Sequence, residues 1–425
     1  MIVTEKIIRN GFKLMTKKVS DTFCVLPFMH VATNAAGSYR VCCNSTPGEN
    51  TILQENGKPY KIYKHDLDEV WNSPTYTTIR KQFIDGERPD MCARCFREED
   101  AGVRSARAGF NEKWLKEDVK IDVEIPVDVK YVDLRLGNLC NLKCRMCNPW
   151  ASSMWVKDWN KVQDAAFEEP SQKLDENTLE FMNTMTEWPD WEKTGITFTE
   201  IAHTVEEIYL TGGEPTLAVS QYKLLDYCIE HDLASGIRLK YNTNLTNVPP
   251  KMIEYWSHFK RVQLNCSIDA VGARDRYIRY PSHWHIVERT FDELSKLDNV
   301  YIQIHCTVQA LNICALHEVI EFAESRGLQH DQLYLNILNH PRSMNIQVLP
   351  HHLKTLALYN LKKHSAWPKV DDVLKYLNAG HTYNDHWQEF IDYNLKMDEL
   401  QRGKLVDACP EFANQHPLLM IKNDD

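Results

Sequence analysis

The sequence contains no long hydrophobic run. No stretch approaches the roughly 20 apolar residues that a helix needs to cross a bilayer. Residues 1–18 are interrupted by charged side chains and hold no apolar core of the kind found in secretion signals. We therefore expect a soluble, cytoplasmic protein with no membrane partner.

An excess of positive charge is also missing. The chain has 49 Lys and Arg against 59 Asp and Glu, which gives a formal net charge of −10. A protein that binds nucleic acid through a broad basic face carries the opposite balance, so general nucleic-acid binding is not expected. The chain also lacks internal repeats and low-complexity segments. Its 425 residues are enough for two or three domains, or for one large barrel with extensions.

Cysteine, in contrast, is abundant. The count of 13 is odd and the chain is long, which fits poorly with a small domain held by disulfides. Eight of the 13 precede residue 148, and seven of those eight stand in CC, CxxC or CxxxCxxC groups. Clustered thiols in a reducing compartment often hold metal. The scattered later cysteines are expected in the apolar core, with the last of them left open: Cys228, Cys266, Cys306, Cys314 and Cys409.

From residue 127 onward, short runs rich in Val, Ile, Leu and Tyr alternate with segments of helical spacing. This alternation predicts a parallel sheet with right-handed crossovers. Six such units are too few for a closed eight-stranded barrel, so we predict an α/β fold with an open, partial (β/α)6 barrel. The predicted strands are Val129–Leu136, Glu207–Leu210, Ile237–Asn242, Arg261–Ile268, Tyr301–Val308 and Gln332–Ile337.

The barrel is expected to be flanked on both sides. The predicted domains are an N-terminal module over 1–126, the barrel over 127–350 and a helical extension over 351–425.

Within the module, we predict a lead-in helix over 1–20, a hairpin over 21–45 and a helix over 66–86. Residues 151–200 form a mostly helical insertion rich in tryptophan. These tryptophans either pack onto the barrel or line a surface for a partner or substrate.

Three cysteines directly after the first predicted strand form the strongest motif, Cys140, Cys144 and Cys147. Three thiolates in one loop can each bind one iron of a cubane cluster, which leaves the fourth iron without a protein ligand. A structural metal site is normally closed by a fourth ligand. The alternative is therefore a zinc loop that recruits a distant fourth Cys or His.

This CxxxCxxC spacing after the first strand of a partial barrel resembles the radical SAM superfamily, and the resemblance extends over about residues 127–345. It implies that the amino and carboxylate groups of S-adenosylmethionine chelate the open iron of a [4Fe–4S] cluster. Reductive cleavage would then yield methionine and a 5′-deoxyadenosyl radical. An external electron donor of the flavodoxin or ferredoxin type is expected as a partner. Met146 stands where the family usually has an aromatic residue.

A second motif, Gly212-Gly213-Glu214-Pro215, follows the second predicted strand. Paired glycines let the backbone approach a ligand closely, and a carboxylate can accept hydrogen bonds from an ammonium group. The resemblance implies that Gly212, Gly213 and Glu214 bind the methionine amino group of the cofactor.

Three more residues at strand ends complete the expected cofactor site. Asn244 ends a segment that resembles the family's TNG motif, with Leu245 in place of glycine. Ser267 belongs to a segment that resembles SxDG, with Ala270 in place of glycine, and Arg279 follows twelve residues later. The resemblance implies that Ser267 and Arg279 hold the methionine carboxylate. Barrel active sites lie at such C-terminal strand ends.

The N-terminal cysteines resemble the twitch module, a shortened relative of the SPASM domain that carries an auxiliary [4Fe–4S] cluster. The resemblance implies four ligands, Cys24, Cys42, Cys92 and Cys95. Cys42 is preferred to Cys43 because it stands five residues after the hairpin glycine, as in related sequences. The module usually follows the barrel, whereas here it precedes it. A zinc site made by the same four cysteines is the alternative.

The resemblance implies a radical SAM enzyme that abstracts hydrogen from a peptide or protein side chain. A nucleoside, sugar or other small metabolite as substrate is the first alternative. A non-catalytic iron–sulfur protein for electron transfer is the second.

Overall fold

The computed structural model describes residues 19–45, 51–102, 104–116, 118–166, 173–186, 188, 191–379, 386–401 and 403–413. The predicted lead-in helix over residues 1–20 lies almost wholly outside these ranges. The described residues form two compact units. The first lies within Met1–Thr33, Ser38–Asp133 and Glu192–Val205, and the second within Asn34–Gly37, Leu134–Trp191 and Glu206–Asp425.

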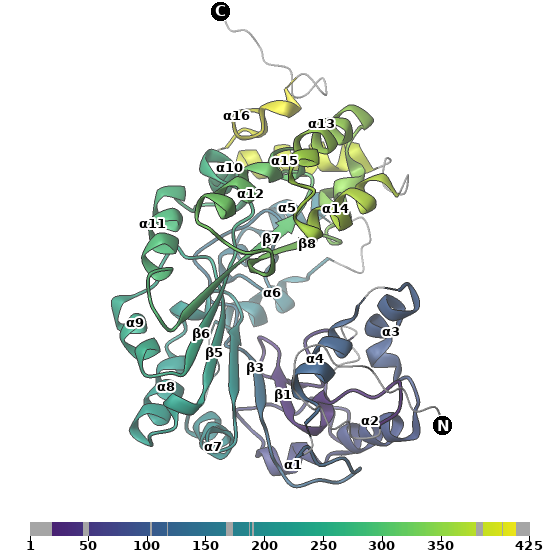
Figure 1. Cartoon of the computed structure of the whole chain (residues 1–425), viewed down its shortest axis with the longest axis vertical. Helices are drawn as coiled ribbons and strands as arrows, with labels where there is room; N and C mark the ends of the chain where they lie inside the picture. The colour runs from purple at the N-terminus through teal and green to yellow at the C-terminus, as the bar shows by residue number, and fades with distance from the viewer. Residues whose placement is uncertain are drawn as a thin grey trace, which may run out of the picture. The chain divides into compact units, whose positions relative to one another are not determined.

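The second unit contains the predicted open barrel (Figure 1). The strands occur in the order β3-β4-β5-β6-β7-β8, and β4 to β8 pair in parallel. The α/β class and the open parallel sheet are therefore confirmed, and the observed strands lie close to the predicted ones. They are β3 (Tyr131–Arg135), β4 (Glu207–Thr211), β5 (Arg238–Thr243), β6 (Arg261–Cys266), β7 (Val300–Val308) and β8 (Leu333–Ile337).

Helices cover the outer side of these strands, as Figure 1 shows for α8, α9 and α11. Because side chains alternate across a strand, one face of β5 is buried against the helices and the other is half-buried. Tyr241 of β5, for example, packs its ring 5.3 Å from that of Trp256 in α9. The helices are α8 (Ser220–Glu230), α9 (Pro250–Ser257), α10 (Gly272–Ile278), α11 (Trp284–Leu294) and α12 (Leu316–Ser325).

The first unit contains the predicted hairpin in a shorter form. Strand β1 (His30–Thr33) pairs antiparallel with β2 (Tyr39–Arg40). The residues before β1 form a 3-10 helix, Leu26–Phe28, where the sequence predicted strand, because Pro27 has no N–H to offer a sheet. Strand β1 also pairs in parallel with the start of β3, which the sequence did not predict.

The single helix predicted over 66–86 is wrong, since two helices are present. Helix α1 (Leu67–Trp71) ends before α2 (Pro74–Asp85), and Pro74 occupies the first turn of the second helix, where a missing N–H costs nothing. Helix α2 ends at Gly86, whose φ of +82° suits a helix C-terminus. The unit also contains α3 (Ala93–Asp100), α4 (Ala106–Trp114) and α7 (Trp191–Ala202).

The insertion contributes α5 (Trp159–Ala166) and α6 (Glu176–Asn183) to the second unit. Trp155, Trp159 and Trp188 are all buried, so the packing interpretation is confirmed for these three and the partner-surface interpretation is wrong for them. The side chain of Trp191 lies outside the described residues.

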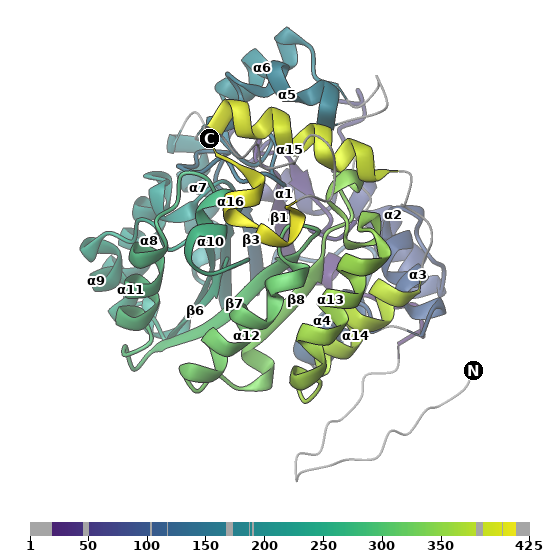
Figure 2. The same cartoon turned by 90° about the horizontal axis from the view of Figure 1, so that it is seen from above.

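The C-terminal stretch is helical and also belongs to the second unit. Its main elements are α13 (His351–Leu361), α14 (Pro368–Asn378), α15 (Trp387–Gln401) and α16 (Leu405–Ala408). Helix α15 packs against α5 of the insertion (Figure 2).

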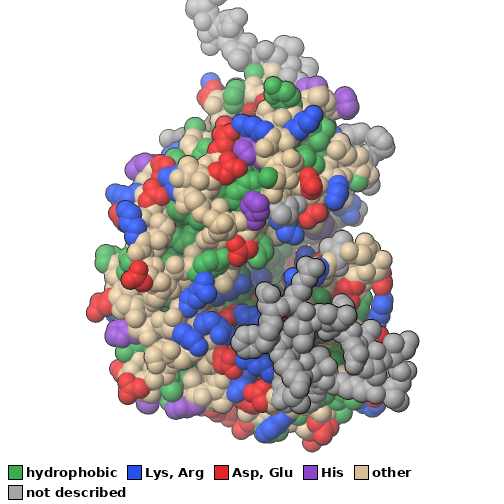
Figure 3. All heavy atoms as spheres, viewed as in Figure 1, with side chains coloured by type: hydrophobic (Ala, Val, Ile, Leu, Met, Phe, Trp, Pro, Cys, Tyr) green, Lys and Arg blue, Asp and Glu red, His purple; other side chains and the backbone are tan. Residues whose placement is uncertain are grey.

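None of the helices among the described residues is long and apolar enough to cross a membrane. Acidic and basic side chains are both present across the face drawn in Figure 3, in keeping with the mixed charge of the sequence.

Candidate active site

The loop after β3 carries the three motif cysteines and is held by the segment that follows it. Cys144 is buried, and Cys140 and Cys147 are half-buried. The indole Nε1–H of Trp155 donates to the Cys144 carbonyl at 3.2 Å. The hydroxyl of Ser152 donates to the Leu142 carbonyl at 2.7 Å. The backbone between the cysteines is therefore fixed by hydrogen bonds rather than exposed as an open turn.

The three thiols share a buried environment that disfavours their charged form. Burial raises the pKa of Cys140 to about 12 and raises the pKa of Cys144 and Cys147 as well. Without a metal, these side chains would be protonated at neutral pH. Metal ions displace such protons, and three thiolates in one loop are the donor set that an iron–sulfur cluster with one open iron requires. The residues present therefore fit such a cluster.

The glycine pair lies directly against this loop. A Cβ atom on Gly213 would stand 2.1 Å from the carbonyl oxygen of Leu139, and one on Gly212 would stand 2.7 Å from that of Gly137. Gly212 also has a φ of +128°, which L side chains rarely adopt. The amide of Glu214 donates to the Leu139 carbonyl at 2.7 Å. The two glycines thus allow the 212–214 segment to touch the backbone just before Cys140.

Gly213→Ala is expected to destabilise the protein by about 1–3 kcal/mol, because the added methyl group meets backbone that cannot rotate away. We also expect it to lower the iron bound at the 140–147 loop. Gly236→Ala is the matched control, since a Cβ there meets nothing within 4 Å. Urea denaturation and iron analysis of both variants would check this, and equal stability of the two would contradict it.

Glu214 is buried, and its carboxylate joins two strand ends. One oxygen accepts from the Thr216 hydroxyl at 2.7 Å, and the other accepts from the backbone N–H of Asn244 at 2.7 Å. Burial raises the pKa of Glu214, although these hydrogen bonds act in the opposite direction. The residue thereby fixes the loop after β4 to the end of β5.

Asn244 connects the same strand end to the cysteine loop. Its amide Nδ2 donates to Oδ1 of Asn141, the residue after Cys140, at 2.9 Å. Leu245 stands where the family's TNG motif has glycine. Its φ of +61° shows that this leucine adopts the left-handed backbone conformation that glycine favours. Ala270 does not adopt a positive φ. In the described part of the chain, the non-glycine residues that do so are Asp232 and Leu245.

Arg279 is buried at the end of α10. Its Nε lies 2.8 Å from Oδ2 of the fully buried Asp269, without the alignment of a hydrogen bond, so the contact is an ion pair. The residue before Arg279 touches the cysteine loop, because the backbone N–H of Arg145 donates to the Ile278 carbonyl at 2.8 Å. Burial raises the pKa of Cys144, and the charge of Arg279 acts in the opposite direction. Ser267 is half-buried, and its amide donates to the Thr243 carbonyl at 2.8 Å.

The N-terminal cysteines meet in the first unit. Cys24, Cys42, Cys92 and Cys95 line one small cavity, and Cys43 is not among its lining residues. Leu26, Phe83, Phe110 and Arg107 complete much of its wall.

Burial raises the pKa of all four cavity thiols, to about 12 for Cys92. Arg107 opposes this effect at Cys92. In the part of the chain that the structure describes, no three His, Cys, Asp or Glu side chains form a group that could hold a single metal ion. The four thiols line one shared cavity, and four cysteines are the donor set that a closed [4Fe–4S] cluster requires.

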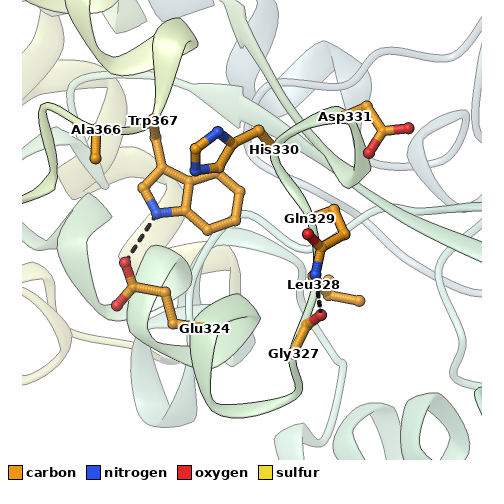
Figure 4. Close-up of a pocket in the computed structure, with 8 residues that line it drawn as sticks. All are labelled: Glu324, Gly327, Leu328, Gln329, His330, Asp331, Ala366 and Trp367. Atoms are coloured by element: carbon orange, nitrogen blue, oxygen red, sulfur yellow. Dashed lines mark hydrogen bonds between the residues drawn. The ribbon is translucent and has the colours of Figure 1, made fainter.

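A separate hollow is lined by residues 327–331, just before β8, and by Glu324, Ala366 and Trp367 (Figure 4). In it, Nε1–H of Trp367 donates to Glu324 at 2.8 Å, and the His330 ring stands 4.9 Å from the indole. Because barrel active sites lie at the C-terminal strand ends, this hollow is not part of the candidate site.

Two family models match the chain. Residues 134–323 match the radical SAM superfamily, and residues 24–96 match the SPASM model, an iron–sulfur cluster-binding domain. The second match spans all four cavity cysteines and favours the iron–sulfur interpretation over zinc. No curated protein matches the chain.

Two solved structures are similar to parts of this chain. "Native anSMEcpe with bound AdoMet" is 17% identical over 57% of this chain and 60% of that chain, with a TM-score of 0.35. Streptococcus suis SuiB bound to precursor peptide SuiA is 12% identical over 73% and 66%, with a TM-score of 0.30. The match with anSMEcpe therefore spans about three fifths of the length of that protein.

Proposed function

This chain belongs to the radical SAM superfamily, and from that premise we propose that Cys140, Cys144 and Cys147 hold a [4Fe–4S] cluster at which S-adenosylmethionine is cleaved. When bound by these three cysteines, the cluster and S-adenosylmethionine would supply reductive radical chemistry for hydrogen abstraction from the substrate. The observation that carries the proposal is the contact between the cysteine loop and the Gly212-Gly213-Glu214 segment.

The residues of the chain orient the cofactor and exclude water. Gly212 and Gly213 bring polar backbone groups within reach of the loop that carries Cys140. Arg279 contributes a buried positive charge beside the thiolates, and Asp269 fixes its position. Asn244 and Ser267 lie at neighbouring strand ends, where we place the rest of the methionine-binding site.

We propose a peptide or protein side chain as the substrate. The SPASM-type module supports this, because family members that carry it often act on peptides. The four cysteines of that module are proposed to bind the auxiliary [4Fe–4S] cluster. An external flavodoxin or ferredoxin is proposed as the source of electrons.

The inner face of the barrel also supports a polar substrate. A closed barrel fills its interior with branched apolar side chains, whereas here Lys240, Asn242 and Asn265 alternate with the helix-facing residues of β5 and β6. On β7, His305 stacks on Tyr334 with ring centroids 4.7 Å apart.

His305 has a buried Nε2 that lacks a hydrogen-bond partner among the described residues. Burial, aided by the charge of Lys240, lowers the pKa of His305 to about 3, so the imidazole is neutral at pH 7. A neutral ring nitrogen of this kind suits an amide or hydroxyl group of a substrate.

Deuterium transfer tests the substrate class. The anaerobically reconstituted protein would be incubated with S-adenosylmethionine, dithionite and a uniformly deuterated peptide digest. We expect deuterium in the 5′-deoxyadenosine that forms. Transfer from deuterated nucleosides or sugars, with none from peptides, would instead establish the small-metabolite alternative.

A further inference from the structure

Arg145 lies between the second and third motif cysteines and is fully buried. Its Nε donates to the Tyr277 carbonyl at 2.9 Å, and one terminal nitrogen donates to Oδ1 of Asp398 at 2.7 Å. The other terminal nitrogen is 3.2 Å from both the carbonyl and Oδ1 of Asn394. The guanidinium carbon stands 3.6 Å from the centre of the Tyr277 ring. Each side of this cation is therefore engaged.

Two of these partners, Asn394 and Asp398, belong to α15, which begins about 240 residues after the cysteine loop. The same helix contacts the main chain of the loop. The Tyr393 hydroxyl donates to the Arg145 carbonyl, and Nε2 of Gln401 donates to the Lys143 carbonyl at 2.9 Å. Helix α15 thus holds the backbone on both sides of Cys144.

Asp398 accepts hydrogen bonds from three different segments of the chain. Besides Arg145, it accepts from the Tyr277 hydroxyl at 2.8 Å and from the Leu405 amide at 2.7 Å. A buried arginine that loses its carboxylate is strongly disfavoured, because the cation remains desolvated without compensation. Asp398 therefore keeps Arg145 in place and links α15 to the start of α16.

A cluster site with three protein ligands needs such outside support. A fourth ligand would normally help to fix the geometry of the loop, and groups that orient metal ligands from behind matter almost as much as the ligands themselves. In this loop, those groups come from α10 through Tyr277 and from α15 through Asp398 and Tyr393.

We propose that α15 is part of the cluster site, and that Asp398, acting through Arg145, is a positioning residue for the cysteine loop. This inference rests on the function proposed above. It assigns to the C-terminal extension a role in the chemistry that its sequence does not reveal.

Asp398→Asn tests the proposal, with Glu399→Gln as the matched control. Both variants replace an acid by its amide on the same helix, but Glu399 is exposed and forms an ion pair with the exposed Lys396. Wild type and Glu399→Gln should bind about eight irons per chain, the content of two cubane clusters. Asp398→Asn should bind about four, retain the auxiliary cluster and lose the change in the electron paramagnetic resonance signal on addition of S-adenosylmethionine. Full iron with an unchanged signal would overturn the proposal, and so would loss of both clusters together with the helical circular dichroism.

Tyr393→Phe provides a second, milder variant that removes one hydroxyl. We expect it to keep its iron but to shift the reduction potential of the site-differentiated cluster and leave that of the auxiliary cluster unchanged. Identical potentials in wild type and variant would overturn the proposal. These readouts do not depend on turnover: a wild type that binds both clusters but cleaves no S-adenosylmethionine would refute the proposed function and not the positioning role.

Discussion

Cys144→Ala is expected to abolish the formation of 5′-deoxyadenosine, with a loss of at least about 1000-fold, or about 4 kcal/mol of transition-state stabilisation. Cys144 is the buried member of the motif, and its carbonyl is fixed by Trp155. With two thiolates left, the loop cannot hold three irons of a cubane, and the iron that should bind S-adenosylmethionine is lost with the cluster.

Liquid chromatography of the reduced, reconstituted enzyme would measure this loss. Cys228→Ala is the matched control, because Cys228 is a buried cysteine of α8 that is not predicted to bind metal. The control should keep both clusters and most of its activity, and Cys144→Ala should keep about four irons. Comparable 5′-deoxyadenosine formation by Cys144→Ala and Cys228→Ala would show that the 140–147 loop is not the site of cleavage.

Cys92→Ala is expected to remove the auxiliary cluster and to separate cofactor cleavage from substrate turnover. Cys92 lines the four-thiol cavity of the first unit, so its loss leaves three ligands and an open edge. The second unit supplies none of the four thiols and should still cleave S-adenosylmethionine. We therefore expect 5′-deoxyadenosine to form while modification of the substrate falls by at least about 100-fold, or about 2.7 kcal/mol.

Cys43→Ala is the control for this experiment. Cys43 neighbours Cys42 in the chain but does not line the cavity, so its replacement should leave about eight irons bound. Iron analysis and Mössbauer spectroscopy of Cys42→Ala, Cys43→Ala and Cys92→Ala would compare the three. Retention of the auxiliary cluster in Cys42→Ala, with its loss in Cys43→Ala, would contradict the ligand assignment.

The strands of the barrel could be predicted from the sequence because each is a short apolar run between turn signals. Strand β7, for example, was predicted from Tyr301 to Val308 and is observed from Val300 to Val308. The helix predicted over 66–86 failed at Pro74, since apolar spacing continued through a residue that begins a new helix. Pairing of β1 with β3 is a contact between distant segments, and periodicity carries no information about it.

The candidate site was predictable where family motifs mark it and not where single residues join distant segments. The structure brings the glycine pair to the cysteine loop, and it gathers the four N-terminal cysteines around one cavity. The partner of Arg279 lay close by in the predicted SxDG-like segment, as Asp269, but the family pattern drew attention to Ser267 instead.

The contact between Arg145 and Asp398 joins residues 253 positions apart. No local pattern could reveal it. The only signal in the sequence was a charged residue between two of the motif cysteines.

Labelled S-adenosylmethionine tests the central claim most directly. The reduced wild-type protein would be studied by electron–nuclear double resonance with cofactor carrying ¹⁵N in the methionine amino group. We predict a ¹⁵N hyperfine coupling to the reduced cluster, present in Cys92→Ala and absent in Cys144→Ala. A fully loaded wild-type protein without that coupling would contradict the assignment of an open iron to the loop of Cys140, Cys144 and Cys147.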